Sequence, residues 1–180
     1  MALPPGTYTL GPQNGTLAVR TGRTGAAAKA GHNLLLHAMT WEATVTVAED
    51  PAASSVELTV DSSSLRVIEG TGGVQALGDD DKAEIQTTID DEVLKGQPVT
   101  FRSSSVADAD GGLQVDGTLT LRGTSAPIGF ALTLADGHLK GSATVRQTAW
   151  KIKPYSTLFG ALKVVDEVEV ELDAILPSPS

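Results

Sequence analysis

The chain has 180 residues, no cysteine and a formal net charge of −9, from 22 acidic and 13 basic residues. This length fits one domain that can bury a core without disulfides, and the lack of cysteine excludes thiolate catalysis and cysteine-ligated zinc. The acidic balance argues against nucleic-acid binding, and no apolar stretch approaches the roughly 20 residues of a membrane-spanning helix. Residues 1–5 lack the basic and apolar regions of a secretion signal, which predicts a cytoplasmic protein.

The first 41 residues contain no Asp or Glu but carry Arg20, Arg23 and Lys29, with His32 close behind. Arginine forks and free backbone N–H groups suit an anionic head group, and the apolar run 34–36 follows directly. The segment therefore predicts a site for a lipid phosphate. The alternative, that these are solvated charges of a polar turn, stays open and is favoured by the usual exposure of charged side chains.

Several stretches alternate apolar and polar residues, which is typical of strands with one buried face. The predicted strands cover residues 17–21, 41–47, 56–60, 99–106, 113–122, 128–134, 139–145 and 167–174. Turn residues at 110–112, 123–127 and 136–137 separate the later strands. Short connections of this kind predict successive hairpins in an antiparallel sheet.

Residues 79–94 depart from this period and predict one α-helix, because Ile85, Ile89 and Val93 recur every four positions. Asp81, with Glu84 three residues later, is the predicted N-cap. The stretch carries seven acids and one lysine, and Lys95 follows it directly. A solvated helix face is the favoured interpretation, and an acidic docking surface for a partner protein is the alternative.

About eight strands with one buried face predict a mainly β fold, an antiparallel barrel with one flanking helix and short helical turns at 25–30 and 154–162. A sandwich remains open on the period alone. Inward-facing small residues at Gly117, Gly141 and Ala143 favour a cavity over a solid core. We expect a single domain over residues 1–176 and a disordered tail at 177–180.

Standard catalytic motifs are missing from the sequence, and the histidines are His32, His37 and His138. An odd separation places His32 and His37 on opposite faces of a strand, so they should not share a metal ion. Because the sequence has no ligand cluster and no catalytic motif, we predict no metal site and no enzyme. A weaker option is an enzyme with a polar cluster deep in the barrel around His32 or His37.

Trp41 and Trp150 are the largest side chains and are expected to anchor the core. Residues 151–155 and 158–160 follow Trp150 with several apolar groups in a predicted loop. This loop is a candidate cap over the mouth of the barrel.

Three stretches, PVTFRS at 98–103, VDGTLTLRG at 115–123 before Pro127 and Ile128, and RQTAWKI at 146–152, resemble motifs of the YceI-like family of bacterial lipocalin-like proteins. The resemblance implies an antiparallel β-barrel with a helix beside it. It also implies a long apolar ligand, an isoprenoid quinone or a polyisoprenoid, and a protein that is not an enzyme.

We therefore predict non-catalytic binding of an isoprenoid-type lipid inside the barrel. The predicted wall or cap residues are Leu34, Leu36, Val115, Leu119, Phe130, Leu132, Trp150 and Phe159. The predicted contacts of a polar head are Arg20, Arg23, Lys29 and His32. We expect no cofactor besides the bound lipid or quinone, no nucleic-acid partner and no membrane insertion, with a homodimer as one option for assembly.

Overall fold

The computed structural model of the protein describes residues 3–180 and is built mainly of strands. The strands are β1 (Gly6–Leu10), β2 (Gly15–Thr21), β3 (Arg23–Thr24), β4 (Asn33–Ala38), β5 (Trp41–Val47), β6 (Ser55–Val60), β7 (Leu65–Thr71), β8 (Val99–Ala109), β9 (Gly112–Leu121), β10 (Thr124–Ala135), β11 (His138–Arg146), β12 (Ser156–Thr157), β13 (Leu162–Val164) and β14 (Glu167–Ile175). The helical segments are α1 (Asp79–Thr88), the π-helical turn η4 (Ile89–Val93) and the 3₁₀ turns η1 (Ala28–Ala30), η2 (Pro51–Ala53), η3 (Ser62–Ser64), η5 (Gln147–Trp150) and η6 (Leu158–Gly160).

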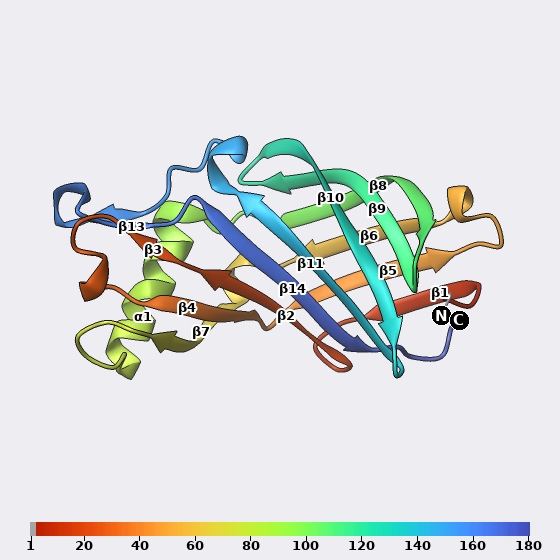
Figure 1. Cartoon of the computed structure of the whole chain (residues 1–180), viewed down its shortest axis with the longest axis horizontal. Coiled ribbons are helices and arrows are strands. Elements are labelled where there is room, and N and C mark those ends of the chain that lie inside the picture. The colour runs from red at the N-terminus through yellow and green to blue at the C-terminus, as the bar shows by residue number, and fades with distance from the viewer. Residues whose placement is uncertain (1–2) are drawn as a thin grey trace.

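The main sheet is antiparallel throughout, in the order β1-β5-β6-β8-β9-β10-β11-β14-β2-β4-β7. A small second sheet, β12-β13-β3, lies at the end of the molecule opposite the chain termini (Figure 1). The predicted mainly β fold with consecutive hairpins from β8 to β11 is confirmed.

Three pairs of consecutive strands, β1 with β2, β4 with β5 and β6 with β7, are the halves of longer bent strands. Only Met39 and Thr40 separate β4 from β5. The Met39 N–H donates to the Ser64 carbonyl at 3.1 Å and the Asp61 N–H donates to the Thr40 carbonyl at 3.0 Å, so the ladder continues across the bend. One half of each bent strand (β1, β5 or β6) stands at the start of the strand order, and the other half (β2, β4 or β7) stands at its end. The sheet therefore curls back onto itself around one interior.

The strand number differs slightly from the prediction because of these bends. The eleven strands of the main sheet make eight longer ones when each bent pair is counted once. The lipocalin-like arrangement expected from the sequence is confirmed.

The barrel is packed solid at the end that holds the termini. The side chains almost completely buried at this end include those of Tyr8, Val115 and Leu139. The Tyr8 hydroxyl donates to the Pro4 carbonyl at 2.7 Å. The tail 177–180, predicted to be disordered, lies beside β1, where the Ser180 N–H donates to the Thr7 carbonyl at 2.9 Å. This end of the barrel is closed by its own side chains.

The helix α1 lies at the opposite end, below β3 and β13 in the view of Figure 1. Its N-cap is Gly78, and the Gly78 N–H donates to the Asp81 carboxylate at 2.8 Å. The prediction of Asp81 as N-cap was wrong by three positions, because the carboxylate reaches back from the first turn. The predicted helix 79–94 is α-helical only to Thr88 and continues as η4 to Val93.

Of the two predicted helical turns, the first shortens to η1 at Ala28–Ala30. The second, predicted over 154–162, is mostly wrong. The chain forms β12 first and then η6, in which Phe159 has left-handed backbone angles of φ 54° and ψ 35°.

Candidate functional site

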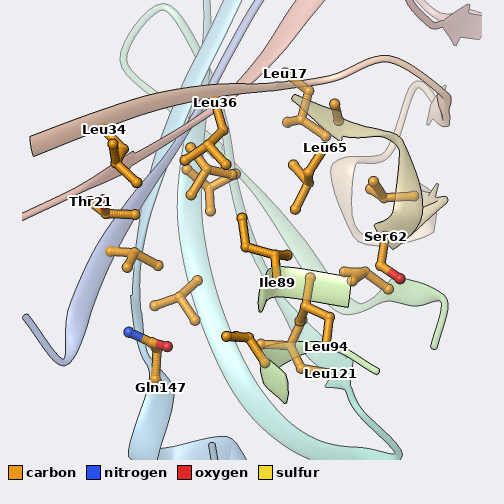
Figure 2. A pocket seen from close by; sticks show the side chains of 18 of the residues that line it. Leu17, Thr21, Leu34, Leu36, Ser62, Leu65, Ile89, Leu94, Leu121 and Gln147 are labelled. Carbon is orange, nitrogen blue, oxygen red and sulfur yellow. The ribbon is translucent and has the colours of Figure 1, made fainter. Parts of the chain in front are cut away.

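A cavity of about 820 Å³ lies between the packed end of the barrel and α1. Figure 2 shows leucine side chains from several strands pointing into it, among them Leu17, Leu34, Leu36 and Leu65. Lining residues alternate along their strands, as Leu17 and Val19 do on β2 and Leu34 and Leu36 do on β4, so one face of each strand lines the cavity. The volume is at the upper end of the range of about 300–1,000 Å³ that is usual for ligand pockets.

The helical segment forms one wall of the cavity. Ile85, Ile89, Val93 and Leu94 all line it, which confirms that the four-residue period marks the buried side of the helix. The same segment exposes Asp79 and other acids to solvent. The apolar side chains of this segment therefore complete a lining that the strands leave open.

Two aromatic rings lie on the wall made by β8, β9 and β10. The Phe101 and Phe130 ring centroids are 5.1 Å apart, with a tilt of 57°. Gly117 lies between their strands, and a Cβ there would come within 2.6 Å of Phe101 Cζ and closer still to the Arg102 carbonyl. The expectation that Gly117 leaves free volume was wrong, because the Phe101 ring fills that space. Gly141 and Ala143 do line the cavity as expected.

Polar residues in the lining include a group at the rim near α1. The His32 Nε2–H donates to the Gln75 carbonyl at 2.6 Å and ties the segment 74–77 to the barrel. Asp81 and Glu84 from α1 also line the cavity. Charge at this rim therefore comes from carboxylates.

Deeper in the wall, two polar atoms are buried without a hydrogen-bond partner, Trp41 Nε1 and Ser62 Oγ. Gln147 is also buried in the lining, but its Nε2 donates to the Val165 carbonyl at 3.2 Å. The interior is thus almost wholly apolar, and its few polar groups are uncharged.

Six of the residues predicted as ligand contacts lie in the cavity lining. They are Leu34, Leu36, Leu119, Phe130, Leu132 and His32. The leucines and Phe130 follow the alternation from which they were predicted, and His32 lies at the rim next to Gln75.

The other predicted wall residues lie elsewhere. Val115 is buried at the packed end of the barrel, outside the cavity lining. The Trp150 side chain is also buried, and its Nε1–H donates to the Leu119 carbonyl at 2.7 Å instead of capping the mouth. Phe159 is fully exposed to solvent. A two-residue period distinguishes inside from outside, but it does not tell which inward residues pack and which border a void.

The three predicted cations also lie outside the lining. Arg20 is on the outer wall, where its Nε is 3.1 Å from the Glu171 carboxylate. The Arg23 guanidinium donates to the Gly31 carbonyl, and Lys29 is exposed on η1. The structure does not bring this basic segment to the interior, because outward strand positions and a polar turn hold its charges.

Most of the wall was not named in the sequence prediction. Leu17, Leu58, Ile128 and Ile152 line the cavity, and so do the apolar residues of the helical segment. The inward period of β2, β6 and β10 carries the information for the first three. Ile152 follows η5 and shows no such pattern.

Carboxylates with a shifted pKa lie on the outside of the barrel. A hydrogen bond from Thr148 lowers the pKa of Asp166. A hydrogen bond from the His138 ring lowers the pKa of Asp173. Within residues 3–180 there is no group of three or more His, Asp or Glu side chains arranged to hold a metal ion. Over the same residues, no helix is both long and apolar enough to cross a bilayer.

Residues 8–176 match the YceI-like domain family. The structure is similar to that of BcnA from Burkholderia cenocepacia, with 17% identity, a TM-score of 0.65 and coverage of 91% of this chain and 96% of the other. It is also similar to the YceI protein of Campylobacter jejuni, with 14% identity, a TM-score of 0.54 and coverage of 79% and 84%. A comparison with curated protein sequences gave no match. The match spans nearly all of the chain, so this protein belongs to the YceI-like family.

Proposed function

We propose that the protein binds one long, uncharged isoprenoid-type lipid, a polyisoprenoid or an isoprenoid quinone, inside the barrel and performs no catalysis. Such binding would serve storage, transport or protection of the lipid under stress. The observation that carries the proposal is the continuous apolar lining of the 820 Å³ cavity. Membership of a family of binding proteins supports it.

The energetics favour a long hydrocarbon. Each buried methylene contributes about 0.8 kcal/mol, so several isoprene units offset the ordering of the ligand. The opposed rings of Phe101 and Phe130 offer flat apolar surface to the branched chain. Ile85 and Ile89 cover it from the side of the helix. A ligand of this kind needs no interior charge.

The rim argues for an uncharged head group. His32 is already bonded to Gln75, and Asp81 and Glu84 would repel a phosphate. A hydroxyl or quinone oxygen meets no such repulsion. This changes the expectation from the sequence, in which a basic segment would bind an anionic head.

The test is to extract purified protein with organic solvent and identify the released lipids by mass spectrometry. We expect one class of isoprenoid lipid in a defined molar ratio to protein. Protein stripped of lipid should then take up added polyprenol or quinone. An empty cavity that also refuses both compounds would contradict the proposal.

Docking of a partner protein through the acidic helix stays a second candidate. Asp79, Asp80 and Asp91 are exposed, while Ile85 and Ile89 on the same helical segment face the cavity. Neutralising the exposed acids, together with Asp90, should abolish capture of such a partner without changing lipid content. Unchanged capture would exclude this role.

A further inference from the structure

Two exposed apolar side chains project at the end of the molecule where the cavity opens. They belong to the tip loop, which we define as residues 156–163, from β12 through η6 to Lys163 of β13. Phe159 is fully exposed and Leu158 is 53% exposed. Large apolar side chains that project together from a loop are a common mark of a contact surface.

The backbone of the tip loop holds these side chains outward. Leu158 and Phe159 both have φ of 54°, and Gly160 has φ of 83°. Left-handed angles are uncommon in residues with a Cβ, and such conformations gather at functional sites. The Ala161 N–H donates to the Leu158 carbonyl at 3.0 Å and closes the turn.

The tip loop begins and ends at the rim of the cavity. Tyr155 and Val164 both line the cavity, and the Val164 N–H donates to the Tyr155 carbonyl at 2.9 Å. A surface that meets Phe159 therefore also lies close to the opening.

The two chain segments that form the tip loop and its neighbours carry only basic charges, although the whole chain is acidic. No Asp or Glu occurs from Gly137 to Val165, nor in the first 41 residues. These two acid-free segments meet at the small sheet, where Lys163 pairs with Thr24. The Ala27 N–H also donates to the Ala161 carbonyl at 2.8 Å and brings η1, with Lys29, to the tip loop.

The lysines of this end are free to meet an external anion. Among the residues that the structure describes, no carboxylate lies within 4 Å of the amino groups of Lys29, Lys151, Lys153 or Lys163, whereas Lys140 on the barrel wall is 3.4 Å from Asp173. Acids also lie at this end of the molecule, since Asp81 and Glu84 line the cavity and Glu92 borders a small surface pocket with Lys153. Screening limits charge effects to about 10 Å at 0.1 M salt, so Lys29 and Lys163 set the local charge beside Leu158 and Phe159.

We propose that the tip loop is a docking site for an anionic phospholipid bilayer. Leu158 and Phe159 enter the apolar boundary of the bilayer, and Lys29 and Lys163 meet phosphate head groups. Apolar side chains ringed by lysines are the combination that binds such interfaces. This inference rests on the proposed function and deepens it. A docked tip loop would turn the mouth of the cavity toward the membrane from which a lipid is taken up or to which it is delivered.

The experiment is flotation of the full chain with vesicles that contain no isoprenoid, made of phosphatidylcholine alone or with phosphatidylglycerol. We expect binding to the anionic vesicles that falls as salt is added. The double variant L158S/F159S should bind about tenfold more weakly, because it loses two insertable side chains. The double variant K29Q/K163Q should lose the preference for phosphatidylglycerol.

Two matched controls isolate the site. Ile175 is also an exposed apolar residue, but it lies on β14 away from the tip, so I175S should leave binding unchanged. K140Q removes a charge from the barrel wall and should also have no effect. No flotation by the wild type, equal binding to both vesicles, or equal loss in the controls would each overturn the proposal. Lipid extraction from the same preparations separates this result from failure of the cavity proposal.

Discussion

The indole Nε1–H of Trp150 donates a 2.7 Å hydrogen bond to the carbonyl of Leu119, which joins η5 to β9 in the buried interior. The side chain is only 4% exposed. Trp150 therefore anchors the segment that follows β11 to the barrel wall, and its side chain does not close the cavity.

The variant W150F tests this role. It removes the donor and leaves a buried carbonyl with one partner fewer, which should lower the free energy of unfolding by about 1–3 kcal/mol. Denaturant titration measures the change, and lipid content should be preserved in the folded fraction. Loss of lipid at unchanged stability would instead make Trp150 a ligand contact.

Filling the cavity should block lipid uptake. Ala143 lines the cavity, so the ring in A143F occupies space needed by the ligand and should weaken uptake of a polyprenol at least about tenfold. Ala131 is a matched control, because it pairs with Ser142 on the adjacent strand but is exposed on the outer face. If A131F reduces uptake as much as A143F, ligand binding does not occur in this cavity.

The carboxylates at the rim should select against anionic head groups. The wild type is expected to bind a polyprenol more tightly than the corresponding polyprenyl phosphate. E84Q should narrow that difference by up to about fivefold, since one charge at about 4 Å in water is worth about 1 kcal/mol. E42Q, on an exposed position of β5, is the control. A wild type that prefers the phosphate would exclude an uncharged head group.

Two serines of η3 differ in their hydrogen bonds and should respond differently to substitution. Ser62 Oγ is buried without a partner, whereas Ser64 Oγ donates to the Asp61 carbonyl at 2.7 Å and accepts from the Thr40 N–H at 3.0 Å. S62A should therefore keep or raise thermal stability, while S64A should lower the free energy of unfolding by about 1–2 kcal/mol. Equal losses in both variants would show that Ser62 has a partner in solution.

The pair formed by His138 and Asp173 gives a pH prediction. The hydrogen bond from His138 Nδ1, 2.7 Å from Asp173 Oδ1, lowers the pKa of Asp173 in the folded protein. Ionised Asp173 therefore favours folding above its unfolded pKa of about 3.9, and this contribution is lost as the pH falls through the lower folded value. D173N should cost stability at pH 6 and much less at pH 2. A cost that does not change with pH would exclude a charge effect.

The sequence predicted the strands well where side chains alternate, because the direction of each side chain follows the two-residue period. It missed β4, where three consecutive leucines at 34–36 hide the alternation, and it missed β1 and β7. The bends that join β4 to β5 and β6 to β7 arise from curvature of the closed sheet. That curvature depends on contacts between segments far apart in the chain.

The site was predicted in part for the same reason. Leu36 and Leu132 were found because the inward face of a strand can be read locally. Gly117 was misjudged because the ring that fills its space comes from Phe101, on a neighbouring strand. The direction of the Trp150 indole and the outward position of Arg20 depend on partners 31 and 151 residues away.

The position of β14 has a consequence for biosynthesis. This strand, Glu167–Ile175, pairs with β11 on one side and with β2 on the other, so the ring is completed only when the last strand of the barrel has been synthesised. Until then the nascent chain exposes the apolar faces of β2 and β11, which chaperones recognise. The cavity does not exist on a partial chain. Any lipid cargo must therefore be loaded after β14 has been synthesised, and a chain interrupted before Glu167 should be cleared by proteases.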